Sequence, residues 1–430
     1  MRIAATSAAV VAFGLLLGGC SSTKSGKGSG PSGPSGSGGA SSPSATGSTS
    51  SSGRLTASFD PPLVFDKQSV AELSGDVLGS STDGINNYYR STLDGTVIYT
   101  VTGDSLSAID VETGQPKWNV PVDRAETMNS HVAAPALVDG KVYAAFETTI
   151  PGKGTTPEQP AITVVVADAA SGQAAAPIQI PTPDADPAGA LASRGATKVY
   201  GVSGNLVAIN RGAGTFGVNI DTKSLVWQRK NFITRAVIDD VVIGLDTKPV
   251  PDDGSDRVLG LRIADGKQAW AATERSPGIQ VTSAGPHLVL VDTEKSADFL
   301  SAADGTIRAK LPPTVSTPLL GGTWCSYDDR SITVCKGTYS MIGIDPTSPG
   351  KPKWEIKDGG TREIPEVSAV FHGAIYGKTS NGPIVLDAVT GADKPDSPVL
   401  VPTFVNEHVG IGSVEAEDAT SAVGAFAPIK

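Results

Sequence analysis

The chain has 430 residues, with 34 Lys and Arg against 44 Asp and Glu and a formal net charge of −10. This acidic balance, without any cluster of Lys and Arg, excludes a nucleic-acid-binding protein, because such proteins neutralise phosphates with grouped basic side chains. Only Arg2, Lys24 and Lys27 of the basic residues precede residue 54, so the remainder is more acidic still.

The first twenty residues have the pattern of an export signal. Arg2 is followed by a mostly apolar run through Leu17, which is too short to span a bilayer permanently. Leu17-Gly18-Gly19-Cys20 resembles the lipobox of bacterial lipoproteins, in which the cysteine sulfur is diacylglycerylated and the chain is cut just before it. The resemblance implies a signal peptide at 1–19 and membrane attachment through lipidated Cys20, since two acyl chains anchor a domain durably. The alternative is an ordinary signal peptide with a chance cysteine.

Residues 20–53 form a predicted disordered linker behind the lipid anchor. They are almost wholly Ser, Gly, Thr, Pro and Ala, and such a stretch has no apolar surface to bury against its ordering entropy. The linker and the Ala/Gly/Ser bias favour an extracytoplasmic protein on the cell membrane of a high-GC Gram-positive bacterium.

A repeat of short β-strands and turns begins after the linker, and residues 94–118 are its clearest copy. Asp110 can accept hydrogen bonds from the N–H groups of a turn, Gly114 supplies a positive φ, and Trp118 offers a flat apolar surface to bury between sheets. Further copies carry the counterparts of these residues, which are Trp227, Trp270, Trp354, Asp387 and Gly391.

The spacing of the copies indicates the length of one repeat. The counterparts of Asp110 stand at 168, 221, 262, 301, 345 and 387, a period of about 42 residues with two longer early steps. Loop insertions at 149–160 and 181–190 account for the long steps. This period is typical of a four-stranded antiparallel blade, and the sequence therefore predicts an all-β fold in which residues 54–430 form a β-propeller.

The copies resemble the pyrroloquinoline-quinone-type propeller repeat, Ala-x-Asp-x-x-Thr-Gly-x-x-x-Trp, over about residues 84–395. The resemblance implies a quinoprotein-like propeller, similar in fold to the propeller lipoprotein of the outer-membrane barrel-assembly machine. Quinoprotein dehydrogenases, that lipoprotein and the sensor domains of membrane kinases share this repeat. It therefore indicates the fold and not an activity.

Seven copies leave the number of blades open between seven and eight. Two strand-like segments follow the last copy, at 409–414 and 422–427, and another lies at 55–65. We expect eight blades, with the N-terminal segment completing the blade of the C-terminal tail, because joining the chain ends removes an exposed sheet edge.

Cys325 and Cys335 flank the turn-like Asp328-Asp329-Arg330. A hairpin would place the two side chains opposite each other, and an oxidising compartment would join them, so we predict a disulfide. A redox-active pair or a metal site would need a different spacing or a nearby histidine.

No catalytic, cofactor-binding or metal-binding set is recognisable. Arg54, Arg90 and Arg235 could lie near a channel but read as solvated surface residues, and the histidines at 131, 287, 372 and 408 fall in different predicted blades. The acidic segment 251–256 lacks the distant glutamate of a calcium loop, and reads as a polar hairpin.

We therefore expect no enzyme and no cofactor. The leading hypothesis is a membrane-anchored extracytoplasmic binding or scaffold lipoprotein, whose propeller meets a protein, a peptide or an envelope polymer. The alternative is a quinoprotein-like dehydrogenase using pyrroloquinoline quinone and calcium, although the adjacent cysteine pair of that family is missing. A role in barrel assembly, by analogy with the outer-membrane lipoprotein, ranks third because a Gram-positive envelope would lack that machine.

Overall fold

The computed structural model describes residues 55–78, 90–123, 133–182, 197–247, 255–293, 296–311, 324–396, 400–415 and 421–430. The predicted signal peptide, Cys20 and linker lie outside these residues. Ser51–Lys430 forms one unit, and the fold below is that of this unit. None of the helices in the described residues is long and apolar enough to cross a membrane.

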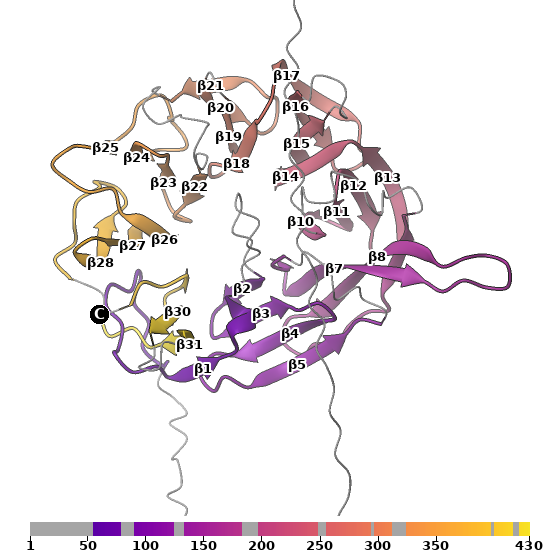
Figure 1. Ribbon diagram of the computed structural model, residues 1–430, viewed down its shortest axis with the longest axis horizontal. Coiled ribbons are helices and arrows are strands. Elements are labelled where there is room, and N and C mark those ends of the chain that lie inside the picture. The colour runs from indigo at the N-terminus through magenta and orange to yellow at the C-terminus, as the bar shows by residue number, and fades with distance from the viewer. Residues whose placement is uncertain are drawn as a thin grey trace, which may run out of the picture. The chain divides into compact units, whose positions relative to one another are not determined.

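Eight antiparallel sheets stand around a central axis in the described part of the chain (Figure 1). Each sheet is one blade, and its first strand lies nearest the axis. Blades 1 to 4 contain β2 (Ser91–Asp94), β3 (Val97–Val101), β4 (Ser105–Asp110) and β5 (Pro116–Pro121); β6 (Ala136–Val138), β7 (Lys141–Ile150), β8 (Gln159–Asp168) and β9 (Ile178–Pro181); β10 (Lys198–Ser203), β11 (Leu206–Arg211), β12 (Gly214–Asn219) and β13 (Ser224–Lys230); and β14 (Phe232–Ile238), β15 (Val241–Thr247), β16 (Asp256–Arg262) and β17 (Gln268–Ser276).

Blades 5 to 8 complete the ring. They contain β18 (Gln280–Ser283), β19 (Leu288–Asp292), β20 (Ala297–Ser301) and β21 (Ile307–Lys310); β22 (Trp324–Tyr327), β23 (Thr333–Lys336), β24 (Ser340–Ile344) and β25 (Trp354–Lys357); β26 (Glu366–Phe371), β27 (Ala374–Thr379) and β28 (Gly382–Asp387); and β29 (Phe404–Val405), β30 (Gly410–Glu415), β31 (Ser421–Phe426) and β1 (Ala71–Leu73). The described helix is a single 3₁₀ turn, η1 (Gly75–Val77). The predicted all-β propeller of eight blades is thus confirmed, and blade 7 has three strands in the described residues.

Blade 8 joins the two ends of the propeller sequence. Its three inner strands come from the C-terminal end, and β1 pairs outside them, with Ala71 opposite Ala425 and Leu73 opposite Val423. The predicted closure is confirmed, but the closing strand is Ala71–Leu73 and not 55–65. Residues 55–65 contain Pro61 and Pro62, which cannot donate to a strand ladder, and only Phe65 forms a bridge, to Pro428.

The insertion at 149–160 lengthens a hairpin rather than forming a separate loop. Strands β7 and β8 pair continuously from Lys141 and Asp168 out to Ile150 and Gln159, and the hairpin projects as an arm from blade 2 (Figure 1). The pairs Thr149–Pro160 and Ile150–Gln159 belong to this ladder. The second predicted insertion, 181–190, lies outside the described residues beyond Thr182.

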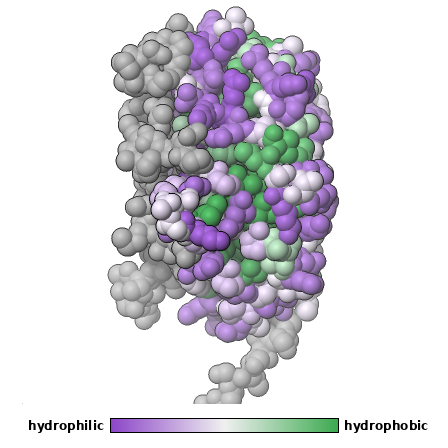
Figure 2. Space-filling view, turned by 90° about the vertical axis from the view of Figure 1, so that its right-hand side faces the viewer, coloured by the Kyte–Doolittle hydropathy of each residue, from purple (hydrophilic) through white to green (hydrophobic). Residues whose placement is uncertain are grey.

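The core lies between neighbouring blades. Ile162 and Val164 of blade 2, for example, pack against Val207 and Phe216 of blade 3, and all four are buried. On the outer wall of the ring, Figure 2 shows a band of apolar side chains among polar ones. Apolar side chains packed between each pair of neighbouring sheets therefore hold the propeller together.

Candidate functional site

The turns between the third and fourth strands of the blades, the CD turns, hold the repeat residues. In blade 1, the Asp110 Oδ1 atom accepts hydrogen bonds from Glu112 N at 2.9 Å and Thr113 N at 3.1 Å, and Gly114 has a φ of 69°. In blade 7, Asp387 and Gly391 repeat this geometry, with a φ of 70° at the glycine. These residues fix turns and leave no free chemical group.

The third copy of the repeat begins its turn two residues earlier than the sequence predicts. Asn219, not Asp221, occupies the position of Asp110, because its Oδ1 atom accepts hydrogen bonds from Asp221 N and Thr222 N, both at 2.9 Å. Lys223 then stands at the turn glycine and has a positive φ of 52°. An asparagine accepts the same turn hydrogen bonds as an aspartate. The sequence alone therefore does not show which of Asn219 and Asp221 occupies this turn position.

The repeat tryptophans join each blade to the next. Each indole N–H donates to a carbonyl oxygen of the following blade, and each ring lies over the CD-turn glycine of that blade. The four hydrogen bonds are Trp118 to Ala169 at 3.0 Å, Trp227 to Ile263 at 2.7 Å, Trp270 to Ala302 at 2.8 Å and Trp354 to Ala388 at 2.7 Å. These residues position blades and do not form a reactive site.

The predicted disulfide is confirmed. Cys325 on β22 lies opposite Cys335 on β23, and their sulfur atoms are 2.06 Å apart. The bridge closes the first hairpin of blade 6.

Three of the four histidines lie in the turns between the first and second strands of a blade, the AB turns. His287, His372 and His408 belong to blades 5, 7 and 8, and His131 lies outside the described residues. His287 Nδ1 pairs with Asp239 in the AB turn of blade 4, and His408 Nε2 lies 3.5 Å from Glu407 Oε1. The AB turns therefore carry acid–histidine pairs rather than isolated histidines.

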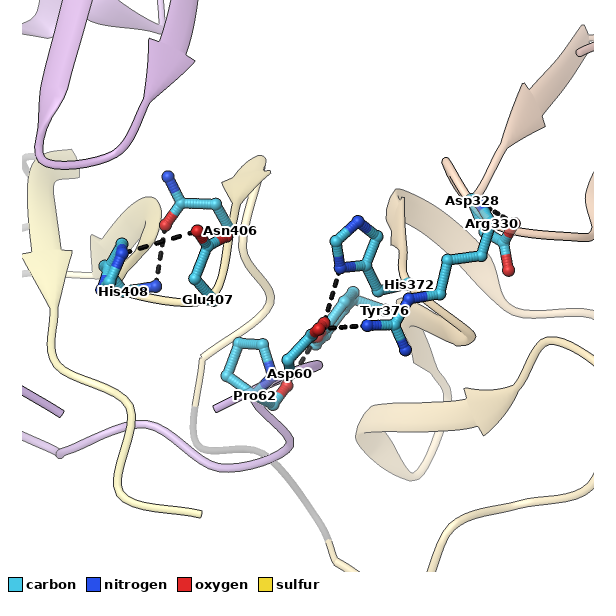
Figure 3. A network of polar contacts seen from close by, with 9 residues as sticks. All are labelled: Asp60, Pro62, Asp328, Arg330, His372, Tyr376, Asn406, Glu407 and His408. Atoms are coloured by element: carbon cyan, nitrogen blue, oxygen red, sulfur yellow. Dashed lines mark hydrogen bonds and ion pairs between the residues drawn. The ribbon is translucent and has the colours of Figure 1, made fainter. Parts of the chain in front are cut away.

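Asp60 is the centre of a polar network at the AB turns (Figure 3). One carboxylate oxygen lies 2.5 Å from His372 Nδ1 of blade 7, and the other pairs with the Arg330 guanidinium of blade 6. Phe59 N, next to it, donates to Glu407 O of blade 8 at 2.9 Å. We call Asp60, Arg330, His372 and Tyr376 the seam network, because the segment carrying Asp60 here crosses three blades beside the closure of the ring.

Tyr376, on β27 of blade 7, holds the same segment in place. Its hydroxyl donates to Pro62 O at 2.5 Å, and its fully buried ring lies 6.4 Å from the ring of Phe65. Burial first, and the nearby Asp60 charge second, raise the pKa of Tyr376 above its usual range, so the phenol remains a donor.

Asp328 orders the AB turn that presents Arg330. Its Oδ1 atom accepts hydrogen bonds from Arg330 N, Ser331 N and Ile332 N at 2.9, 2.7 and 2.9 Å. Burial raises the pKa of the neighbouring Asp329, the Asp328 charge raises it further, and His372 opposes the shift. The sequence pattern indicated only His372 and the Asp328-Asp329-Arg330 turn of this network. Asp60 stands in no recognisable motif.

Two arginines considered for a channel are half-buried rather than solvated. Arg235 belongs to β14, an innermost strand, and Arg90 directly precedes β2, another innermost strand. Arg90 Nε is buried without a hydrogen-bond partner in the described structure. Arg54 and most of the acidic segment 251–256 lie outside the described residues.

The residues present do not fit a calcium–quinone pair. No three His, Cys, Asp or Glu side chains gather to hold a metal ion in the part of the chain that the structure describes. The two cysteines of the propeller are bonded across a hairpin instead of being adjacent in sequence. The donor set that the quinone dehydrogenase alternative needs is therefore not assembled by the described residues.

The eight blades and their Asp, Gly and Trp repeats define a β-propeller of pyrroloquinoline-quinone-type repeats. Residues 63–272, slightly less than half of the chain, match the family described as outer membrane protein assembly factor BamB. The resemblance seen in the sequence is thereby confirmed. No curated protein gives a significant match to the sequence.

Several solved structures are similar to this chain at low sequence identity. BamB from Moraxella catarrhalis is 10% identical, with a TM-score of 0.42, over 81% of this chain and 98% of that one. A europium-containing methanol dehydrogenase is 12% identical, with a TM-score of 0.40, over 85% and 89% of the two chains. Hsv2p from Kluyveromyces lactis is 9% identical, with a TM-score of 0.40, over 77% and 94%.

Proposed function

We propose that this protein is an extracytoplasmic lipoprotein, anchored through Cys20, whose propeller is a binding or scaffold platform for a protein, peptide or polymer of the cell envelope. The observation that carries the proposal is how the residues following the predicted linker are built into the ring. Asp60 pairs with blades 6 and 7, and Phe65 and β1 belong to blade 8.

This attachment suits a tethered platform. Because the residues that follow the predicted linker contact several blades, a pull on the linker is distributed over the ring instead of peeling one edge strand. Rigid sheets in turn hold the connecting loops in fixed positions, and such loops commonly carry binding sites. The family described as an outer membrane assembly factor supports a role in which the propeller contacts other proteins.

The anchor is tested by replacing Cys20. In cells fed an alkyne-labelled fatty acid, the wild-type protein should carry the label and sediment with membranes. Cys20→Ser should lose the label and leave the membrane fraction. Retained labelling, or unchanged sedimentation of Cys20→Ser, would exclude lipidation at this residue.

Binding is tested by crosslinking the anchored protein in living cells and identifying what it captures. The proposal expects the same envelope protein or polymer in independent preparations, and loss of that capture when the propeller is deleted behind an intact linker. Recovery of no reproducible partner, together with turnover of an alcohol or sugar after addition of pyrroloquinoline quinone and calcium, would replace this proposal with the dehydrogenase alternative.

A further inference from the structure

A polar cleft of about 440 Å³ lies between blades 6 and 7, at the ends of the blades away from the AB turns. One wall is the turn between β23 and β24, with Lys336 and Thr338. The other wall is the connection from β25 to β26, residues 358–364. Its volume falls in the range of small-molecule sites, about 300–1,000 Å³.

Hydrogen bonds hold both walls in place. Asp358 N donates to Tyr339 O at 2.8 Å, which joins one wall to the other. The Glu363 carboxylate accepts hydrogen bonds from Ser380 N at 2.9 Å and from Ser380 Oγ at 2.6 Å, and Arg362 pairs with Asp393. These two charged residues therefore fasten the connection to blade 7, and the cleft is formed in advance of any ligand.

The remaining polar groups of the cleft are available to a ligand. Neither the Lys336 ammonium nor the Asp358 carboxylate has a hydrogen-bond or ion-pair partner among the described residues. Thr338 and Thr361 add hydroxyl groups, and Gly359 and Gly360 leave the backbone uncovered. The cleft thus offers both donors and acceptors, with one charge of each sign that is unpaired within the described part of the chain.

This mixture matches a ligand that both donates and accepts hydrogen bonds at several neighbouring positions. Hydroxyl groups of a sugar do so, since each can accept from an ammonium and donate to a carboxylate. Ile364 also lines the cleft, and its apolar side chain can pack against the apolar face of a sugar ring. A polyanion would gain from Lys336 but be repelled by Asp358.

We propose that the cleft between blades 6 and 7 binds an uncharged, hydroxyl-rich saccharide of the cell envelope, with Lys336 and Asp358 as the principal hydrogen-bonding groups. This inference rests on the proposed binding function and names the chemical class of one ligand. Ile364 supplies the apolar contact, and the two glycines allow the sugar to approach the backbone.

The test measures binding of neutral hexose and N-acetylhexosamine oligosaccharides to the full chain by calorimetry. Wild type should bind at least one of them, and Lys336→Met or Asp358→Asn should each weaken it by about tenfold or more, because each removes a charged hydrogen bond. Ile364→Ala should weaken binding more than Ile364→Val. Lys267→Met, at an exposed lysine of blade 4, is the matched control and should bind like wild type.

A second measurement does not depend on variants that fold. Adding the saccharide to labelled wild-type protein should shift the amide resonances of Thr338, Gly359 and Thr361. No binding at millimolar saccharide, equal affinity of the variants, shifts elsewhere only, or preferential binding of free amino acids or peptide termini would overturn the proposal. In each case reproducible capture of an envelope partner in cells would leave the proposed function standing, and the two failures are thus distinguishable.

Discussion

Trp227 lies between two glycines, one in its own blade and one in the next. A Cβ atom on Gly217 of β12 would come within 2.1 Å of the indole nitrogen, and one on Gly266 of blade 4 within 2.6 Å of the ring. The indole therefore fits only because both neighbours lack a side chain. The large indole ring and the two glycines that face it therefore pack as one unit. This explains why the repeat contains glycine as well as tryptophan.

Replacing a glycine that a tryptophan ring covers should lower the free energy of unfolding more than replacing a glycine in open space. Gly266 and Gly204 have positive φ values of 65° and 55°, but no atom lies within 4 Å of a Cβ at Gly204. We expect Gly204→Ala to lower the free energy of unfolding by roughly 1–2 kcal/mol from backbone conformation. Gly266→Ala should cost about 1–3 kcal/mol more because the ring must move. Urea unfolding measures both, and equal losses would show that the contact carries no energy.

The CD turns place aspartates where donors surround them, and this gives a pH dependence. The Thr306 hydroxyl, followed by Thr306 N, lowers the pKa of Asp304 from its ordinary value to about 2. A carboxyl whose pKa is lower in the folded state stabilises the fold above its unfolded pKa. That contribution is lost as the pH falls from about 4 towards 2.

Thr306→Val should therefore raise the pKa of Asp304 towards its ordinary value, and Asp304 should then contribute less to the stability that is lost in acid. The carboxyl resonance of Asp304, followed by NMR from pH 5 to 2, reports the pKa directly, and melting temperatures over the same range report stability. Thr155→Val, in the exposed tip of the β7–β8 arm, is the control. An unaltered Asp304 titration in Thr306→Val would contradict the assigned cause.

The β22–β23 hairpin carries a covalent link across its two strands. The cysteines are separated by 10 residues, and on the chain-entropy account closing so short a loop stabilises the fold by about 2–3 kcal/mol. Joint replacement by serine should lower the free energy of unfolding by this amount in guanidinium chloride. Reductant should weaken the wild type similarly and leave the double variant unaffected. Insensitivity of the wild type to reductant would argue against a formed disulfide.

Individual elements were predictable where local sequence determines them. The CD turns depend on residues four positions apart, and the cysteine hairpin depends on residues ten apart, so both could be read from spacing. Pro, Gly and Thr dominate 149–160 and predict a loop there, yet the pairing of β7 with β8 overrides that local preference. At Asn219 the local sequence is ambiguous instead, because asparagine and aspartate can each accept the hydrogen bonds of this turn.

At the scale of the ring, the number of blades followed from counting repeats, but the contacts at the closure did not. Asp60 and His372 are 312 residues apart, and neither stands in a repeat position. The cleft between blades 6 and 7 likewise combines the β23–β24 turn with the β25–β26 connection, and the residues of these two segments share no motif. Such sites arise from the curvature of the sheet arrangement, which brings together loops that sequence spacing does not relate.

The ring should depend on β1 more than on the linker before it. Removing residues through 73 uncovers the ladder edge of β31 at Val423–Ala425 and empties the fully buried position of Phe65 over Gly410. An exposed strand edge invites pairing between molecules, and loss of a buried phenylalanine alone costs about 3–5 kcal/mol. We therefore expect this truncation to melt at lower temperature, without a single sharp transition, and to self-associate on size-exclusion chromatography.

A chain that begins at residue 54 is the matched control, because it lacks the signal peptide, Cys20 and the linker but keeps Phe65 and β1. It should elute as the monomer and melt in one transition. Asp60→Asn in that background separates the seam network from the strand: it weakens the pairs with Arg330 and His372, both partly exposed, and should lower stability by about 1 kcal/mol or less. Equal stability of the two truncations would mean that the C-terminal strands close blade 8 unaided, and the N-terminal segment would then be an attachment to a finished ring.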